Sequence, residues 1–524
     1  MIDRRDLVAG VAAVAAVGTI GGARAQGAGA PQAAPAQSPS PQPPSAAPPP
    51  QSFDPNSTLS LARELAKAPY KAAPSDLPEF LSNLTYEQYV AIRAKPSAMI
   101  WQNDNVGFAI EPLHRGFVFS GAVQIFLVEN GDARRLEYKS ANFDFGSVQP
   151  PANVPDLAFS GFRILAKRDG VFAEVAIFQG ATFFRARAPG QNLGVQARGL
   201  SVRTADPRGE EFPVFKAFWI EKPSLADNTL TIHALLDSES TVGVCRMSVR
   251  PGEATIIDTE LTLVPRVNAD LIGIATMSAK SISSPLERKR PDDVRPYIAE
   301  INGLQMLTGT GEWLWRPTTN RGTLQISSFV DNNPRGFGFM MRDRDFETYL
   351  DDENHWELRP SLWIEPLTDF GPGEVELVEI PADTDTNNNV VAFWRPKGGI
   401  QAGKEASWAY RQFWTWSPAV KNPLAATIYS RGGRAGGQAR RRRFLVAFEG
   451  DVLGDEKATA DLKPSLSTSP GQVQLLRWFH DRKTRRCRVL FDIDVGSDTS
   501  VELRLLLTAG GKPVSETWLY RWSA

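Results

Sequence analysis

The chain has 524 residues, 42% of them hydrophobic, so it is long enough to bury a large core and to form two domains. Its 58 basic residues are balanced by 59 acidic ones, which gives a formal net charge of -1. This balance argues against a nucleic-acid or anionic-membrane partner. The only cysteines, Cys245 and Cys487, fit no close-spaced metal motif, and we expect two separate thiols rather than a disulfide.

The first 25 residues have the features of an export signal. Arg4 and Arg5 precede a short apolar stretch, residues 7–20, and an A-x-A cleavage site follows at Ala23-Arg24-Ala25. The stretch is too short and too rich in Ala and Gly for stable membrane insertion. The paired arginines favour a twin-arginine signal over a Sec signal, and either signal places the mature protein outside the cytoplasm.

Residues 26–52 form a tract rich in Pro, Ala, Gln and Ser with no periodic apolar face. Such a composition cannot bury enough surface to offset the entropy of ordering, so we expect a disordered linker.

Residues 53–400 are predicted to form a large antiparallel β-sandwich. Two short helices begin it: Leu59, Ala62 and Leu65 recur at helical spacing, and Thr85 caps a second segment. After about residue 107 short alternating strands dominate, with hairpin signals at Asn130-Gly131 and Asp169-Gly170. Few long helical patterns interrupt the strands, which argues against a parallel α/β sheet.

Residues 401–524 are predicted to form a second, immunoglobulin-like β-sandwich. A loop-rich KGGIQAGKE stretch precedes a new set of strands that begins with WAYRQFWTW. The set is the right size for seven or eight strands, although the Cys, Trp, Cys signature of true immunoglobulin domains is missing. The predicted fold class is therefore all-β, with two sandwiches.

Several kinds of chemistry are not indicated. The four histidines are scattered, with no HxH or HExxH arrangement, so no metal site is predicted. No GxSxG motif places a serine nucleophile, and no GxxxxGK[ST] loop cradles phosphate.

Aromatic residues and carboxylates remain as candidates. Aromatic rings stack on the apolar faces of sugars while polar side chains bond the hydroxyls, so their mixture is typical of a saccharide site. For Trp313 and Trp315, a place in the core is an equal alternative. The candidate sugar-binding residues are Trp313, Trp315, Arg316, Tyr349, Trp356, Arg359 and Trp363.

Hydrolysis of a glycosidic bond needs two carboxyl groups, one to protonate the leaving oxygen and one to activate water or attack directly. Glu300, Asp383 and Asp385 are the candidate catalytic residues, together with the acidic cluster at residues 351–353. Asp383 and Asp385 lie in the loop PADTDTNNNV, for which a solvated turn is the simpler interpretation.

Long ordered segments of the chain resemble the periplasmic glucan biosynthesis proteins, the osmoregulated periplasmic glucan G/D family. The similar segments include KAFWIEKP, HALLDSESTVGVCRM, GTGEWLWRP, DNNPRGFGFMMRDRDF, RPSLWIEP, VELVEIP and SETWLYRW. The resemblance spans roughly residues 59–522, and the twin-arginine signal is closer to the D branch.

The resemblance implies a mutarotase-like sandwich with a long cleft, followed by an immunoglobulin-like domain. It also implies a periplasmic protein that acts on the β-1,2-glucan backbone by inverting hydrolysis or transglycosylation. No metal or organic cofactor is expected. The implied partners are the glucan and the membrane glucan synthase.

One position departs from the family pattern. The family's proton-donating Asp falls at Asn388, whose amide has no acidic proton to give, while the base position falls at Glu300. Three alternatives follow: Asp385 or Asp383 takes over as the acid, the site performs a transfer with altered geometry, or the protein binds glucan without cleaving it. Asn388 is therefore included among the candidate sugar-binding residues.

Overall fold

The computed structural model describes residues 51–72, 76–224, 226–286, 292–436, 441–496 and 500–523. The predicted signal at 1–25 lies outside these residues, as does all of the predicted linker at 26–52 except Gln51 and Ser52. Within the described parts of the chain, no helix is long and apolar enough to cross a membrane.

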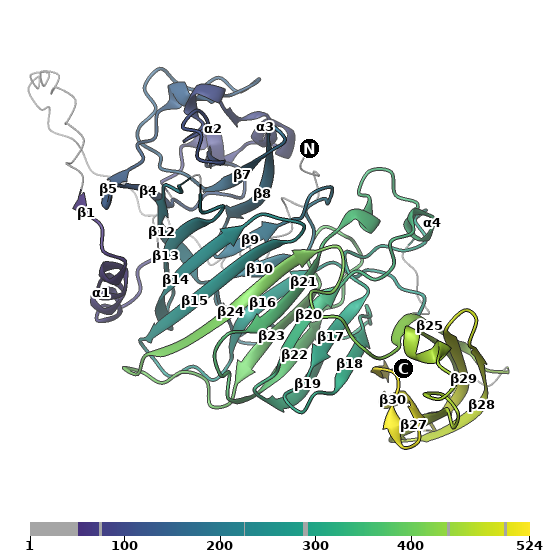
Figure 1. The fold of residues 1–524 in the computed structure, drawn as a ribbon. Coiled ribbons are helices and arrows are strands. Elements are labelled where there is room, and N and C mark those ends of the chain that lie inside the picture. Colours follow the sequence, from purple (N-terminus) through teal and green to yellow (C-terminus); the bar gives the residue numbers. More distant parts are fainter. Residues whose placement is uncertain are drawn as a thin grey trace, which may run out of the picture.

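The described residues are arranged almost entirely as antiparallel β-sheets, which confirms the predicted all-β class (Figure 1). The largest sheet has sixteen strands, and its β31 (Lys512–Pro513) pairs with β30 alone. The other strands are, in spatial order, β1 (Gln51–Ser52), β5 (Asp132–Arg135), β4 (Gln124–Glu129), β12 (Val214–Glu221), β13 (Leu230–Asp237), β14 (Thr241–Arg250), β15 (Thr255–Pro265), β24 (Ala406–Thr415), β21 (Ser361–Pro366), β20 (Gly336–Met340), β17 (Gly303–Leu307), β18 (Trp313–Pro317), β32 (Thr517–Ser523), β30 (Ser500–Ala509) and β27 (Lys463–Ser469).

A ten-stranded sheet packs against this one to complete the first sandwich. Its strands are β19 (Gln325–Asn332), β22 (Pro372–Glu379), β23 (Val390–Pro396), β16 (Ile272–Ala279), β10 (Gln196–Arg198), β9 (Phe183–Ala186), β8 (Val171–Gln179), β7 (Gly161–Arg168) and β3 (Phe108–Leu113), with β11 (Ser201–Val202) beside β16. Apolar side chains from both sheets, such as Ile232 and Phe178, form one core. A separate pair joins β2 (Arg93–Ala94) to β6 (Phe143–Asp144).

The second sandwich packs the β27–β30–β32 end of the large sheet against a four-stranded sheet. The strands of the smaller sheet are β25 (Ala426–Arg434), β26 (Arg441–Glu449), β29 (Arg486–Asp494) and β28 (Gln472–Asp481). In Figure 1 this unit lies beside the β17–β18 end of the first sandwich. Because β18 pairs in parallel with β32, one sheet runs through both sandwiches.

The boundary between the sandwiches lies later than the predicted residue 400. Strand β24, which contains WAYRQFWT, pairs with β15 and β21 of the first sandwich. The alternation of Trp408, Tyr410 and Trp414 turns these rings into the first core, not the second. The KGGIQAGKE stretch is therefore the connection from β23 to β24, and the first sandwich extends to Thr415.

The predicted local elements are confirmed. Helix α1 (Pro55–Ala66) packs Leu59, Ala62 and Leu65 in a small cluster against β13 and β14, and Thr85 makes a capping box at α3 (Tyr86–Ala91). The remaining helices are α2 (Glu79–Ser82), α4 (Phe346–Tyr349) and the 3₁₀ turns η2 (Pro96–Ala98), η3 (Ser140–Asn142), η4 (Trp356–Leu358) and η5 (Asp451–Gly454).

Both predicted hairpins form where the sequence places them. Asn130 and Gly131 join β4 to β5, and Asp169 and Gly170 join β7 to β8. All four residues have positive φ, as two-residue hairpin turns require. The two cysteines lie in β14 and β29 as buried, unbonded thiols.

Candidate functional site

The end of β16 and the two residues after it, residues 278–281, bring the two predicted catalytic regions together. On one side, the backbone N–H of Asn389 donates to Ala279 O at 3.1 Å, and the Ser281 N–H donates to Asn389 Oδ1 at 2.7 Å. On the other side, the Glu300 N–H donates to Lys280 O at 2.9 Å. The loop that carries Asn388 and the strand-like stretch that carries Glu300 therefore flank one short segment.

Glu300 is fully buried at this place. One of its carboxylate oxygens, Oε2, accepts a hydrogen bond from the Lys280 backbone N–H at 3.1 Å. A buried carboxylate held by a backbone donor has a fixed orientation, which is what a base that positions water requires.

Asn388 lies across the same segment and is half-buried. Its Nδ2 donates to Ser278 Oγ at 3.1 Å and to Gln196 Oε1 at 3.3 Å. Its Oδ1 is buried and has no hydrogen-bond partner among the described residues. Because the amide hydrogens are both directed to the protein, Asn388 offers a hydrogen-bond acceptor and no acidic proton.

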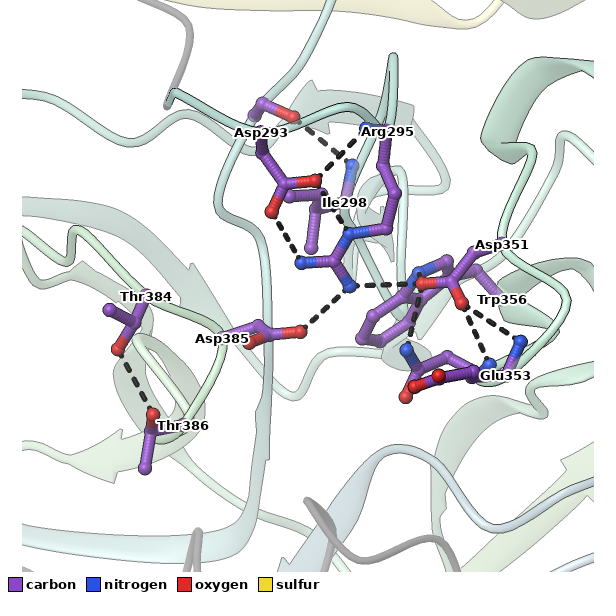
Figure 2. Close-up of polar contacts among 11 residues, drawn as sticks. Asp293, Arg295, Ile298, Asp351, Glu353, Trp356, Thr384, Asp385 and Thr386 are labelled. Atoms are coloured by element: carbon purple, nitrogen blue, oxygen red, sulfur yellow. Dashed lines mark hydrogen bonds and ion pairs between the residues drawn. The ribbon is translucent and has the colours of Figure 1, made fainter.

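Asp385 takes part in a different arrangement, which Figure 2 shows. Its Oδ2 accepts from Arg295 Nη1 at 2.9 Å, and the same nitrogen donates to Asp351 Oδ2 at 2.9 Å. Arg295 also bonds Asp293 through Nε at 2.9 Å and Nη2 at 2.7 Å. Three carboxylates from three separate segments thus surround one guanidinium, and we call Asp293, Arg295, Asp351 and Asp385 the arginine cluster.

The electrostatics of the arginine cluster favour the charged forms of Asp351 and Arg295. Burial alone would raise the pKa of Asp351, but the hydrogen bonds from Arg295, Asn354 and Trp356 outweigh it and lower that pKa to about 2. The three carboxylates, Asp293 first, raise the pKa of Arg295. Asp385 therefore serves as an ion-pair partner that anchors its loop, while Asp383 is exposed two residues earlier.

The predicted sugar-binding residues of the 349–359 region are buried. Trp356 and Tyr349 are in one small apolar cluster, and the Trp356 indole N–H donates to Asp351 Oδ2 at 2.8 Å. The buried Arg359 guanidinium lies 5.2 Å from the Trp356 ring centre. These side chains pack and support the arginine cluster, and they present no open ring face for a sugar.

The candidate tryptophans outside residues 349–359 are also buried, at the junction of the two sandwiches. Trp313, Trp315 and Trp363 belong to the core cluster of the second sandwich, with Trp313 and Trp363 stacked at 6.0 Å. The buried Arg316 pairs with Glu379 at 3.2 Å. Of the predicted binding residues, Asn388 contacts the 278–281 segment that also bonds Glu300, and the buried Trp356 ring lies 5.9 Å from Nζ of Lys280 in that segment.

Gln196, Ser278, Lys280 and Arg295 were not predicted from the sequence. A signal was available for two of them: Gln196 and Ser278 are buried polar residues that are paired across β10 and β16. A buried polar residue in such a strand needs a partner, and here the partners meet at Asn388. Arg295 carries no comparable local signal. Within the described ranges, no group of three or more His, Cys, Asp or Glu could hold a metal ion.

Two joined β-sandwiches with a buried, amide-lined polar site define a large all-β protein. The family described as "Periplasmic glucan biosynthesis protein, MdoG" matches residues 53–522, and the chain belongs to it. The family resemblance expected from the sequence is thereby confirmed.

Individual relatives agree with this assignment. Glucans biosynthesis protein G of Vibrio cholerae is 41% identical over 476 residues, which cover 90% of this chain and 87% of the relative. The proteins of the same name from Rhodopseudomonas palustris (strain BisA53) and Shewanella sp. (strain ANA-3) are 39% and 40% identical, each over 90% of this chain and over 94% and 87% of the relative. These relatives have the G name, and the prediction of the D branch rests on the signal segment alone.

Proposed function

We propose that this protein binds the β-1,2-linked glucan backbone at the site formed by Asn388, Gln196, Ser278 and Glu300, and that it does not cleave the chain. The observation that carries the proposal is the bonding of Asn388. Its amide hydrogens are directed to Ser278 and Gln196, and its buried Oδ1 is left as an acceptor. A sugar hydroxyl would supply the missing donor.

The absence of an acid at this position argues against hydrolysis. A leaving alkoxide has to be protonated as the glycosidic bond breaks, and a positioned acid typically accelerates that step by about 10²–10⁴-fold. Asp385 is the nearest buried alternative in the loop, and its carboxylate already contacts Arg295 at 2.9 Å.

Inverting hydrolysis or transglycosylation is the second candidate. It is supported by the retained carboxylate of Glu300, which lies across residues 278–281 from the Asn388 loop. For Asp385 to act as the acid, it would have to leave Arg295, so this candidate requires a rearrangement of the loop. Trp356 and Arg359 would become accessible to sugar only in such a rearranged state.

The proposed location and partners are inferred from the family to which the chain belongs. The family description places its members in the periplasm, and the paired Arg4 and Arg5 support export by the twin-arginine route. A protein that holds a nascent glucan would pass it on to membrane enzymes, so the glucan synthase is the proposed partner. No cofactor is part of the proposal.

The direct test combines affinity and product analysis on one preparation. Purified mature protein is titrated with linear β-1,2-glucan in a calorimeter, and chain lengths are resolved by chromatography after long incubation. We expect binding with unchanged chain length. Shortened or cyclic products would favour the second candidate, and no binding at millimolar glucan would reject both.

A variant pair locates the binding site. Asn388→Leu removes both the amide donors and the acceptor, and we expect its affinity to fall at least about tenfold, which is ~1.4 kcal/mol of binding free energy. Asn387→Ala, at the exposed neighbouring position, is the matched control and should keep the affinity of the unchanged protein. Equal affinity in the two variants would remove Asn388 from the proposed site.

A further inference from the structure

We propose that the outer face of the four-stranded sheet in the second sandwich is a docking surface for an acidic segment of a partner protein. The sheet has the strand order β25–β26–β29–β28, and its inner face packs in the core of that sandwich. In Figure 1, β28 and β29 lie on the side of the second sandwich that is away from the first. Only the choice of a membrane enzyme as the partner rests on the proposed function.

Two neighbouring rows of side chains cross the middle of the outer face. The strand register places the members of each row opposite one another. The first row is Arg431, Leu445, Leu490 and Arg477, and the second is Tyr429, Ala447, Arg488 and Phe479. Their neighbours along the strands, such as Phe444 and Val489, belong to the core, so the two rows are directed outward. We call these eight residues the docking face.

The three arginines of the docking face have no carboxylate partner among the residues that the structure describes, and all three are exposed. Each lies against an aromatic ring instead. The guanidinium carbon of Arg431 is 5.4 Å from the centre of the Tyr429 ring. Those of Arg477 and Arg488 are 5.4 and 5.8 Å from the centre of the Phe479 ring, which is 51% exposed. Because the rings already limit their freedom, these arginines lose less entropy when they bind a partner.

The rows on either side of the docking face are different, because their arginines are already paired. Arg443 donates to the Asp492 carboxylate at 2.7 and 2.9 Å, and Arg486 pairs with Glu449. The sheet therefore has its ion pairs outside the docking face. The middle of the face is left with positive charges that nothing in the described structure neutralises.

An acidic group is favoured in the middle of the docking face. Arg477 and Arg488 meet at one ring from neighbouring strands, and like charges in such positions repel each other. A carboxylate between them would remove this repulsion and accept charge-assisted hydrogen bonds. Arginine and aromatic side chains around a small apolar centre, here Leu445 and Leu490, are also the composition of protein interfaces at their most stabilising positions.

The width of the docking face limits the shape of the partner segment. Strands about 4.8 Å apart place Arg431 and Arg477 at the ends of a row about 14 Å long. An extended chain rises about 3.3 Å per residue, so two acids about four residues apart match this length. The residue midway between them points to the same side and would cover Leu445 and Leu490. The segment that fits is therefore extended, with an apolar residue between two acids.

The flanking carboxylates favour a protein over an anionic membrane. Glu449 and Asp481 lie in the row on one side of the docking face, and Asp492 lies in the row on the other side. A flat anionic bilayer would approach all of these acids and be repelled by them. A narrow protein segment contacts the two middle rows alone.

The test uses the whole mature chain and a defined probe. The probe is the fluorescein-labelled peptide Gly-Ser-Glu-Ser-Leu-Ser-Glu-Ser-Gly, and its control has Gln in place of both Glu residues. Fluorescence anisotropy gives the dissociation constants. The double variant Arg477→Gln/Arg488→Gln removes two charges from the docking face. Its matched control, Arg485→Gln/Arg486→Gln, removes two charges from exposed arginines that are already paired outside that face.

We expect the unchanged protein to bind the Glu peptide with a dissociation constant below about 1 mM, and the Gln peptide at least about tenfold more weakly. Arg477→Gln/Arg488→Gln should weaken binding of the Glu peptide at least about tenfold, while the control variant stays within about threefold. Both variants should keep the unfolding midpoint, since the four side chains are exposed. Equal affinities of the two variants, or of the two peptides, would overturn the docking face.

Vesicles distinguish a protein partner from a lipid surface. Vesicles of phosphatidylglycerol and phosphatidylcholine should not sediment with the unchanged protein. Sedimentation that Arg477→Gln/Arg488→Gln abolishes would overturn the protein partner and assign the face to an anionic lipid.

Glucan binding by the same variants separates this inference from the proposed function. Arg477→Gln/Arg488→Gln should bind β-1,2-glucan as the unchanged protein does, and a parallel loss of glucan affinity would overturn the docking face as a separate surface. Asn388→Leu should bind the Glu peptide normally. A protein that binds the peptide but no glucan rejects the proposed function and leaves the docking face standing.

Discussion

Two polar regions at the same end of the first sandwich use similar residues in opposite ways. In the arginine cluster, Asp293, Asp351 and Asp385 all accept hydrogen bonds from Arg295. Each carboxylate of the cluster is therefore paired with the same guanidinium. At the candidate site, a neutral amide, Asn388, meets Gln196 and Ser278 and keeps one buried oxygen unbonded. In the 383–389 loop, therefore, the Asp385 carboxylate holds the loop in place through Arg295, while the Asn388 amide faces the site.

The largest expected effect comes from giving the site an acid. Asn388→Asp places a carboxyl group at the position to which the resemblance in the sequence assigns the proton donor, across residues 278–281 from Glu300. We expect hydrolysis of linear β-1,2-glucan to rise about 10²–10⁴-fold above that of the unchanged protein, measured as reducing ends released over time. Adding Glu300→Gln should abolish the gain. If Asn388→Asp stays inactive, the amide is not what prevents cleavage.

The next effect tests whether the arginine cluster is structural. Arg295→Met leaves three carboxylates facing one another without their cation, and the Arg295 side chain is only 12% exposed. Removing one partner of a buried ion pair typically costs several kcal/mol, and we expect the free energy of unfolding to fall by about 3 kcal/mol in urea denaturation.

A surface pair is the control for this variant. Arg208 bonds Asp206 with two contacts of similar length, at 2.9 and 2.8 Å, but its side chain is 69% exposed. Arg208→Met should leave the unfolding curve unchanged, because solvent screens such pairs. If Arg295→Met and Arg208→Met lost the same free energy of unfolding, the burial of the arginine cluster would not make its ion pairs more stabilising than a surface pair.

The pH dependence of stability gives a smaller effect with a defined sign. The pKa of Asp351 is about 2 in the folded protein and near 3.8 when unfolded, so its contribution is complete above about pH 4 and is lost as the pH falls toward 2. The stability gap between the unchanged protein and Asp351→Asn should therefore narrow by about 1–2 kcal/mol over this range. A gap that stays constant from pH 5 to pH 2 would contradict the lowered pKa.

The sequence was sufficient for elements whose signal is local. Asn130-Gly131 and the Thr85 cap were predicted correctly because a turn or a helix start depends on a few neighbouring residues. Strand β24 was assigned to the wrong sandwich because its alternation shows that it has a buried face but not which sheet it joins.

The candidate site was predictable only in part, for a related reason. Glu300 and Asn388 were selected by resemblance, and each has partners from distant segments that no spacing reveals. The tryptophans were selected for chemistry that suits both a sugar and a core, and their burial at the junction depends on the pairing of β18 with β32. Arg295 was missed because its three carboxylates come from separate parts of the chain.

The smallest effect separates two acids within the loop itself. Asp385 is buried against Arg295, whereas Asp383 is exposed. Asp385→Asn should lower the free energy of unfolding by about 1 kcal/mol, since an amide oxygen still accepts from Arg295 but carries no charge. Asp383→Asn should stay within about 0.5 kcal/mol, as is usual for a surface substitution. Because neither residue is placed at the sugar, both variants should bind β-1,2-glucan as the unchanged protein does. A loss of glucan turnover or affinity in Asp385→Asn that exceeds its loss of stability would instead assign this carboxylate to the reaction, and the contrast between an anchoring cluster and an amide site would fail.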